Sequence, residues 1–265
     1  MTDHPLVNKK TYNGLTLLKY KKKVFYRSLW DKELLESRGN ADGKLVPVPF
    51  TKIFNYQENN TTCSTTAKVL VVRKINGFMG AYTNGLYTTT GSFEGPYVGM
   101  FKELVPDPKL LQPNCTYLFE ICHEKDPHII REELGAYLIG VRHPEEEEYN
   151  SSSEKETYLD ELAKINNWKR PEWFTATFAD VLEGANEAEH EGFCVYSKEI
   201  TSKLGKHNAL KIKSQHYLKA KALARGNRAL DDDFALIKKH LPENLSEQER
   251  LTFIFEFLKN HDFAI

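Results

Sequence analysis

Residues 69–77 read Val-Leu-Val-Val-Arg-Lys-Ile-Asn-Gly, an apolar run that passes through one arginine into a lysine and then into turn residues. The run predicts a buried strand. Lys74 stands at its end, where burial of an ammonium group is costly unless the group has a partner or a chemical role. Asn76 and Gly77 suit a tight turn directly after the strand. Lys74 is therefore the first candidate functional residue.

The composition favours one large folded domain with a small appendage. The chain has 265 residues, of which 40% are hydrophobic and 12% aromatic, enough for a substantial core. Lys and Arg number 36 and Asp and Glu 37, which leaves a formal net charge of −1. A polyanion would have to bind a local basic patch, so a histone-like binder is disfavoured. No stretch approaches the roughly 20 apolar residues of a membrane span, and no repeat of a solenoid or propeller is visible.

Cysteine usage predicts reduced thiols in a cytoplasmic protein. The four cysteines have no paired short spacing, and no secretory leader precedes them. Cys115, Cys122 and His123 also lack the spacing of a closed zinc site, which makes a cysteine-based metal protein a remote alternative.

Short β-type runs surround the opening stretch and predict mostly antiparallel sheet. The expected strands cover residues 23–28, 45–49, 68–73, 77–83, 87–90, 116–122, 134–142, 192–197 and 209–213. Asn84-Gly85 is one of the breaks, and both residues tolerate the positive φ of a hairpin turn. The sheet is therefore expected to contain tight hairpins.

Helical spacing of apolar residues appears at 157–166 and 174–184, and again in the last forty residues. Ser246 with Glu249 forms a capping box ahead of the final helix. We expect an α+β fold with one domain over residues 1–225 and a small helical appendage over residues 226–265.

The amine of Lys74 could act as a nucleophile if part of it is deprotonated, a state that burial and neighbouring cations both favour. Four cations could converge on it in the folded sheet: Arg38, Lys52, Lys211 and Lys213. Attack on the α-phosphate of a nucleoside triphosphate would give a lysine-nucleotide phosphoramide, with Asn76 and Gly77 close to the sugar. On this stretch alone, an ordinary hairpin with a solvated lysine is the simpler interpretation.

Two glutamates occupy strand positions where a carboxylate needs a partner. Strand alternation places Glu120 on the face that Leu118 and Cys122 share, where it would bind a ribose or a metal, or form a buried salt bridge without a catalytic role. Glu191 stands just before Gly192 at the mouth of a strand, a position suited to Mg²⁺. The alternative for Glu191 is an exposed glutamate in an acidic segment.

Lys211 and Lys213 stand two residues apart in an alternating run, so their ammonium groups project from one face. Two such charges could hold a triphosphate, although a solvated edge strand would show the same pattern. Arg38 and Lys52 are unremarkable as single residues.

As an ordered set, these residues resemble the covalent nucleotidyltransferases, which comprise ATP- or NAD-dependent ligases and messenger-RNA capping enzymes. The motif order of that superfamily is Lys-X-Asp/Asn-Gly, an acidic strand, a hydrophobic strand, Glu-Gly and Lys-X-Lys. The chain matches it at residues 74–77, 119–121, 138–142, 191–193 and 210–214.

The likeness is greatest to the RNA ligase 1 family of T-even phages. Residues 36–39, Glu-Ser-Arg-Gly, look like that family's Glu-X-Arg-Gly, and residues 49–55, Pro-Phe-Thr-Lys-Ile-Phe-Asn, look like its Arg-Pro-X-X-Lys-Phe-Phe-Asn. The match extends through roughly three quarters of the chain. It implies a nucleotidyltransferase (ATP-grasp-like ligase) domain of antiparallel sheets flanked by helices.

The resemblance also implies an ATP-dependent RNA ligase that joins 5′-phosphate to 3′-hydroxyl ends and uses Mg²⁺ or Mn²⁺. It implies a virus-encoded monomer that acts on RNA in the host cytoplasm. By this likeness Lys74 is adenylylated within Lys74-Ile75-Asn76-Gly77, and Arg38 and Lys52 contact phosphates. Glu120 binds the ribose, with Glu120 and Glu191 as metal ligands. Lys211 and Lys213 engage the triphosphate and assist catalysis.

Two departures limit the likeness. The chain reads Thr89-Thr90-Gly91-Ser92 where the family often has Lys-Gly-Ser, so a basic contact to substrate is missing or comes from elsewhere. The residues after Arg225 are too few for the family's larger specificity domain. A DNA ligase, a GTP-dependent capping enzyme and a non-catalytic protein that binds single strands remain alternatives.

Overall fold

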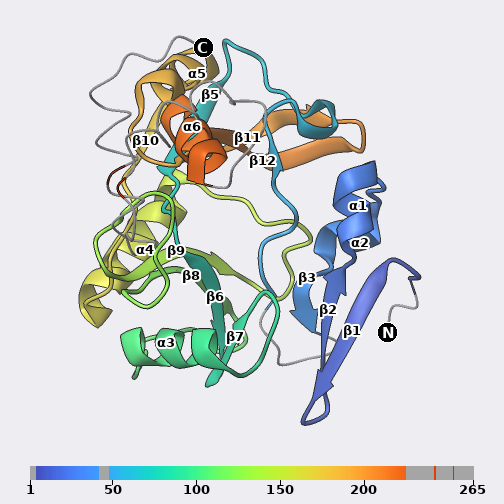
Figure 1. Cartoon of the computed structure of the whole chain (residues 1–265), viewed down its shortest axis with the longest axis vertical. Helices are drawn as coiled ribbons and strands as arrows, with labels where there is room; N and C mark the ends of the chain where they lie inside the picture. The colour runs from blue at the N-terminus through green and yellow to red at the C-terminus, as the bar shows by residue number, and fades with distance from the viewer. Residues whose placement is uncertain (1–3, 42–47, 225–241, 243–252, 254–265) are drawn as a thin grey trace.

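The structure is a computed structural model that describes residues 4–41 and 48–224, together with residues 242 and 253. Two β-sheets pack face to face, helices cover their outer sides, and a third, smaller sheet lies at one side (Figure 1). The α+β fold is as predicted, and every strand pair but one is antiparallel.

The five-stranded sheet carries the opening stretch near its middle. Its strands in spatial order are β10 (Trp173–Thr177), β5 (Lys68–Arg73), β11 (Gly192–Ser202), β12 (Gly205–Lys213) and β4 (Phe54–Asn55). β5 is paired on both edges, and its buried valines explain why the run forms a strand. Helix α5 (Phe178–Glu187) covers the outer face, where Phe178 packs among apolar residues that include Val71 and Leu210.

The four-stranded sheet runs in the order β7 (Leu86–Thr89), β6 (Phe78–Thr83), β8 (Thr116–Cys122) and β9 (Gly135–Arg142). Helices α3 (Pro96–Leu104) and α4 (Ser153–Asn166) cover its outer face. Alternate residues of β8 point to opposite sides, since Phe119 packs in the core under these helices whereas Leu118 packs between the sheets. The Asn84-Gly85 turn between β6 and β7 has φ of 47° and 83°, as predicted.

The third sheet consists of β1 (Val7–Tyr12), β2 (Leu15–Tyr20) and β3 (Arg38–Ala41). Helices α1 (Lys22–Arg27) and α2 (Lys32–Glu36) connect β2 to β3. A partly buried ion pair at 3.0 Å between Glu36 and Arg142 of β9 links this part of the chain to the four-stranded sheet. A short 3₁₀ helix, η1 (Glu58–Asn60), and helix α6 (Gln215–Ala224) complete the described elements.

Three of the sequence predictions need correction. Residues 23–28 form no strand, because residues 22–27 are helix α1, in which Val24 alone is buried and the side chains around it are exposed. The predicted helix at 174–184 begins only at Phe178, because residues 173–177 form the edge strand β10, which pairs with β5. The β1–β2 hairpin was not predicted, although Asn13-Gly14 at its turn has the sequence and positive φ typical of one.

The predicted appendage over 226–265 lies outside the described residues, apart from the two isolated positions. Within the described part, no helix is long and apolar enough to cross a membrane. All four cysteines are free thiols, as expected.

Candidate active site

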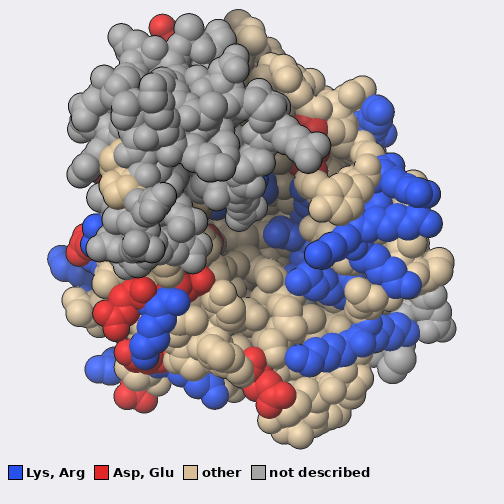
Figure 2. All heavy atoms as spheres, viewed as in Figure 1, with Lys and Arg blue, Asp and Glu red and all other residues tan. Residues whose placement is uncertain are grey.

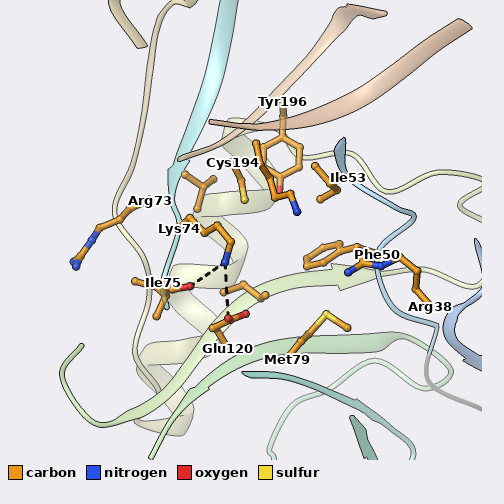
Figure 3. Close-up of a pocket in the computed structure, with 13 residues that line it drawn as sticks. Arg38, Phe50, Ile53, Arg73, Lys74, Ile75, Met79, Glu120, Cys194 and Tyr196 are labelled. Atoms are coloured by element: carbon orange, nitrogen blue, oxygen red, sulfur yellow. Dashed lines mark hydrogen bonds and ion pairs between the residues drawn. The ribbon is translucent and has the colours of Figure 1, made fainter. Parts of the chain in front are cut away.

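A cavity of about 200 Å³ opens between the inner faces of the two large sheets (Figure 3). One side is apolar, with Phe50, Met79 and Ile139 among its lining residues. Charged side chains line the rest: Arg38, Arg73, Lys74, Glu120 and Lys211. With Ile75, which also lines the cavity, the fold thus brings together five of the predicted site residues from segments far apart in the sequence.

Lys74 follows β5 directly, and its backbone N–H donates to the Gly192 carbonyl oxygen at 2.8 Å, which continues the pairing of β5 with β11. Its Nζ donates to Glu191 Oε2 at 3.0 Å and to the carbonyl oxygen of the adjacent residue, Ile75, at 3.2 Å. Glu120 Oε1 lies 3.9 Å from the same nitrogen. The lysine is therefore tied into the site, and the solvated hairpin of the simpler interpretation is wrong.

Glu191 is the hub of the charged cluster and is only 3% exposed. Its Oε2 accepts from Lys74 and, at 2.7 Å, from Asn76 Nδ2, while its Oε1 accepts from Lys213 Nζ at 3.0 Å. Burial opposes ionisation of this carboxyl, but the two lysine charges outweigh it and lower the pKa. An exposed surface glutamate, the alternative interpretation, is thereby excluded.

Glu120 projects from β8 into the cavity, and its Oε1 accepts from the Gly77 N–H at 3.1 Å. Burial, with the negative charge of Glu191, raises its pKa against the opposing effect of Lys74. Gly77 lies so close to β8 that a Cβ there would come within 2.4 Å of the Ile121 carbonyl oxygen. Close approach of the backbone therefore requires glycine at this position. The neighbour that comes so close is strand β8, whereas the sequence analysis expected the sugar of a ligand.

Asn76 and Ile75 serve the packing around Lys74. Asn76 is buried, and while its Nδ2 bonds Glu191, its Oδ1 accepts from the Ile130 N–H at 2.7 Å. A ribose hydroxyl would have to replace one of these bonds, so the predicted sugar contact of Asn76 stays a prediction. Ile75 is buried against Cys122 and lines one end of the cavity.

The expected lowering of the Lys74 pKa is wrong. Burial alone would lower it, but the negative charges of Glu120 and Glu191 outweigh burial and raise the pKa well above its ordinary value. Two of the cations predicted to surround this amine, Arg38 and Lys52, instead lower the pKa of Lys211. The sequence could not show this, because Glu191 stands 117 positions away along the chain.

Lys211 combines burial with neighbouring cations. Burial, together with the charges of Lys52, Arg38 and Lys74, lowers the pKa of Lys211 to about 7. Within the described part of the chain, neither its Nζ nor the guanidinium of Arg38 has an acidic partner, and both side chains line the cavity. Two uncompensated cations beside one cavity form a site for an anion.

Lys213 and Lys52 are already paired. Lys213 binds Glu191, and its Nζ also lies 4.2 Å from the centre of the Tyr217 ring. Lys52 is buried with its Nζ 2.9 Å from Glu58 and 4.8 Å from the centre of the Phe54 ring. Its predicted phosphate contact would require loss of the Glu58 pair, so that contact stays a prediction.

The apolar lining contains two residues that the sequence motifs did not point to. Met79 and Tyr196 line the cavity together with Phe50 and Ile139, which lie within the motifs, and alternation on β6 and β11 was the available signal. Cys194 also lines the cavity. Phe193, its neighbour on β11, faces the opposite side of the sheet with Phe174.

The donor set around Lys74 fits a divalent metal that arrives with phosphates. Glu120 and Glu191 already face a single cation, and Mg²⁺ is commonly held by one or two carboxylates plus substrate phosphate oxygens. Among the residues described, no group of three or more His, Cys, Asp or Glu side chains could hold a metal by itself. A metal here would therefore depend on the bound nucleotide.

Solved structures share the fold of this chain. An archaeal ATP-dependent RNA ligase, in structures described as form 2 and form 1, superposes with TM-scores of 0.57 and 0.56 at 15% identity, over 94% and 95% of this chain and 73% and 74% of the other. An Aquifex aeolicus protein described as an ATP-dependent DNA ligase superposes with a TM-score of 0.54 at 16% identity, over 94% of this chain and 74% of that one.

Scans of protein-family models and of curated proteins found no match. At identities this low, the likeness establishes the fold alone. That fold is the nucleotidyltransferase domain shared by ATP-dependent RNA and DNA ligases.

Proposed function

We propose that the protein is an ATP-dependent RNA ligase, which joins 5′-phosphate to 3′-hydroxyl ends through a covalent lysyl-AMP intermediate. The observation that carries the proposal is the cavity itself, which Lys74 lines together with Arg38 and Lys211, two cations that have no acidic partner within the described part of the chain. The fold supports nucleotidyl transfer. The choice of RNA rests on the sequence motifs that resemble the phage RNA ligase 1 family.

In the first step Lys74 Nζ attacks the α-phosphorus of ATP, the bond to the bridging oxygen of the β-phosphate breaks, and pyrophosphate leaves. The amine must give up protons, and Glu191 and Glu120 are the bases nearest to it. Both carboxylates hold the amine at the cavity wall before reaction, which fixes its position but keeps it protonated and so lowers its nucleophilicity. Exchange of these ion pairs when ATP binds is thus part of activation.

Arg38 and Lys211 would neutralise charge that grows on the phosphoryl oxygens. A bound Mg²⁺ or Mn²⁺, held by Glu120, Glu191 and phosphate oxygens, would add Lewis-acid stabilisation. The 5′-phosphate of RNA then displaces Lys74 from AMP, and the 3′-hydroxyl finally displaces AMP, which forms the phosphodiester. The apolar wall around Phe50 and Met79 would hold the adenine.

The test is covalent labelling with α-³²P ATP and divalent metal, followed by denaturing electrophoresis. The wild-type protein and Lys68→Ala, which removes an exposed lysine from the same strand, should both retain label. Lys74→Arg keeps the positive charge beside Glu191 but lacks a nucleophilic amine, and it should retain none. Label on Lys74→Arg would refute the assignment of the nucleophile.

The substrate is tested separately with the same protein. A 5′-phosphorylated single-stranded RNA should be circularised or joined more efficiently than nicked duplex DNA is sealed. Preferential sealing of the DNA would establish a DNA ligase, and labelling by GTP in place of ATP would establish a capping-type transferase.

A further inference from the structure

The third sheet carries a concentration of positive charge, of which the proposed reaction uses only Arg38. The first 38 residues contain nine Lys or Arg and four Asp or Glu, although the whole chain has a net charge of −1. Figure 2 shows Lys and Arg side chains gathered over the part of the surface formed by this sheet and α1, beside the hollow at the centre of the molecule. The basic patch that the neutral composition required is therefore local and lies near the cavity.

Strand register places three of these cations on neighbouring strands of the sheet. Lys19 of β2 pairs with Asn8 of β1, and Lys10, two residues beyond Asn8, projects to the same face as Lys19. On its other side Lys19 pairs with Arg38 of β3, at a register shift between Leu18 and Lys19. Arg38, Lys19 and Lys10 thus form a row across three strands, roughly 10 Å wide at the usual strand spacing. We name this the cationic row.

The cationic row begins at the cavity and ends at an exposed edge. Arg38 lines the cavity, whereas Lys19 and Lys10 are exposed. Lys10 Nζ donates to Ser92 Oγ at 3.2 Å, and a Cβ on Gly91 would lie 3.5 Å from Lys19 Nζ. These two lysines therefore stand at the turn where the sequence lacks the basic residue that its resemblance leads one to expect. Tyr12 adds a ring on the same face, 38% exposed.

From this placement we infer that the cationic row binds the backbone of a single-stranded polynucleotide and leads its end to the cavity. The inference rests on the proposed function for what happens at that end. A row roughly 10 Å long spans about three phosphates at the 3.4 Å spacing of one stacked strand. Lysines beside an exposed aromatic ring are the combination that binds single strands by charge and stacking. The lysines and the Tyr12 ring together favour a polyanion that carries bases, because an acidic protein surface would not stack on the ring.

The test measures binding of a 5′-phosphorylated, 3′-fluorescein-labelled RNA of about 12 nucleotides by fluorescence anisotropy. Metal and ATP are omitted, and the salt concentration is varied from 50 to 300 mM. Each lysine–phosphate contact contributes about 0.7 to the slope of log K against log salt concentration for single strands. Lys10→Gln/Lys19→Gln should flatten the slope by about 1.4 and weaken binding about 25-fold at 0.1 M salt.

The matched control is Lys109→Gln/Lys164→Gln, which removes two exposed lysines beside the end of α4, on another side of the molecule. The control should bind RNA like the wild type. Lys10→Arg/Lys19→Arg, which keeps both charges of the cationic row, should also bind RNA like the wild type. Wild-type affinity and slope in Lys10→Gln/Lys19→Gln would overturn the inference, and so would equal weakening in the control.

Labelling of the wild-type protein by ATP, without RNA, is scored separately. A protein that binds RNA through the cationic row but takes up no AMP would disprove the proposed ligase and leave the binding surface established.

Discussion

Glu191 is the residue whose loss should be most costly to the site, and Glu191→Gln is the substitution that measures this cost. The glutamine has nearly the same shape and can keep the bond to Asn76. Lys74 and Lys213 each lie 3.0 Å from the carboxylate and are 19% exposed, and the substitution leaves Lys213 without this counter-charge and Lys74 with Glu120 alone, at 3.9 Å. The change therefore removes charge with little change in packing.

The magnitude follows from these distances. Two charges 3.0 Å apart attract by about 5.5 kcal/mol at an effective dielectric constant of about 20, and partial exposure of both lysines reduces that value. Measured losses on removal of one member of a buried ion pair are about 3–5 kcal/mol. We expect a loss in this range in the free energy of unfolding at pH 7. At roughly 2–4 °C per kcal/mol for a domain of this size, the melting temperature should fall by about 6–20 °C.

The pH dependence has a defined sign. Because the folded state lowers the pKa of Glu191, the stability it contributes is present above the ordinary carboxyl pKa of about 4.3 and is lost as the pH falls through the lower, folded-state pKa. The gap between wild type and Glu191→Gln should therefore be full at pH 7 and shrink in stronger acid.

The assay is urea unfolding followed by circular dichroism, repeated from pH 7 down to the acid limit of folding. Glu199→Gln is the matched control, because Glu199 lies on the same strand but is exposed, and its loss should change the unfolding free energy by less than about 0.5 kcal/mol. A loss below about 1 kcal/mol for Glu191→Gln, or a gap that grows in acid, would refute the reasoning.

Two further predictions concern Lys211 and Gly77. Lys211 loses its charge as the pH rises through about 7, so metal-free ATP binding, measured by calorimetry, should weaken above that pH by about tenfold or more as a charged hydrogen bond is lost. Lys211→Met should remove this dependence, and an unchanged profile in that variant would assign it to another group. Gly77→Ala forces a Cβ against the Ile121 backbone and should cost about 1–3 kcal/mol. Gly184→Ala, in open space within α5, should stabilise the protein by about 0.5–1 kcal/mol. Both variants are compared by thermal melts. A change in melting temperature of the same sign for both would mean that close packing at Gly77 does not decide the outcome.

The sequence predicted the large sheets well because their strands carry local signals. Residues 68–73 and 116–122 became strands with the predicted bounds, since runs of buried apolar residues need no distant partner to be recognised. The prediction of a strand at residues 23–28 was wrong because Val, Phe and Tyr favour strands locally, whereas only Val24 is buried in the folded chain.

Which residues meet at the site was predictable in part, and their electrostatics were not. Lys74, Glu120, Lys211 and Arg38 line one cavity as the motif order suggested. The pKa values depend on which charges end up within a few ångströms, and strand pairing between distant segments decides that. As a result, Lys74 lies beside the carboxylates of Glu120 and Glu191, and Lys211 lies beside other cations.

The cavity draws its walls from two parts of the fold. Arg38 enters from the third sheet, while Lys74 and Lys211 belong to the five-stranded sheet, and in Figure 3 Lys74 and Arg38 approach from different sides. A triphosphate bound to all three would act as a non-covalent cross-link between the third sheet and the five-stranded sheet, whereas the Glu36–Arg142 pair connects the third-sheet segment to the four-stranded sheet. Nucleotide would then tighten the whole assembly, and the third sheet would be held most firmly while the cavity is filled.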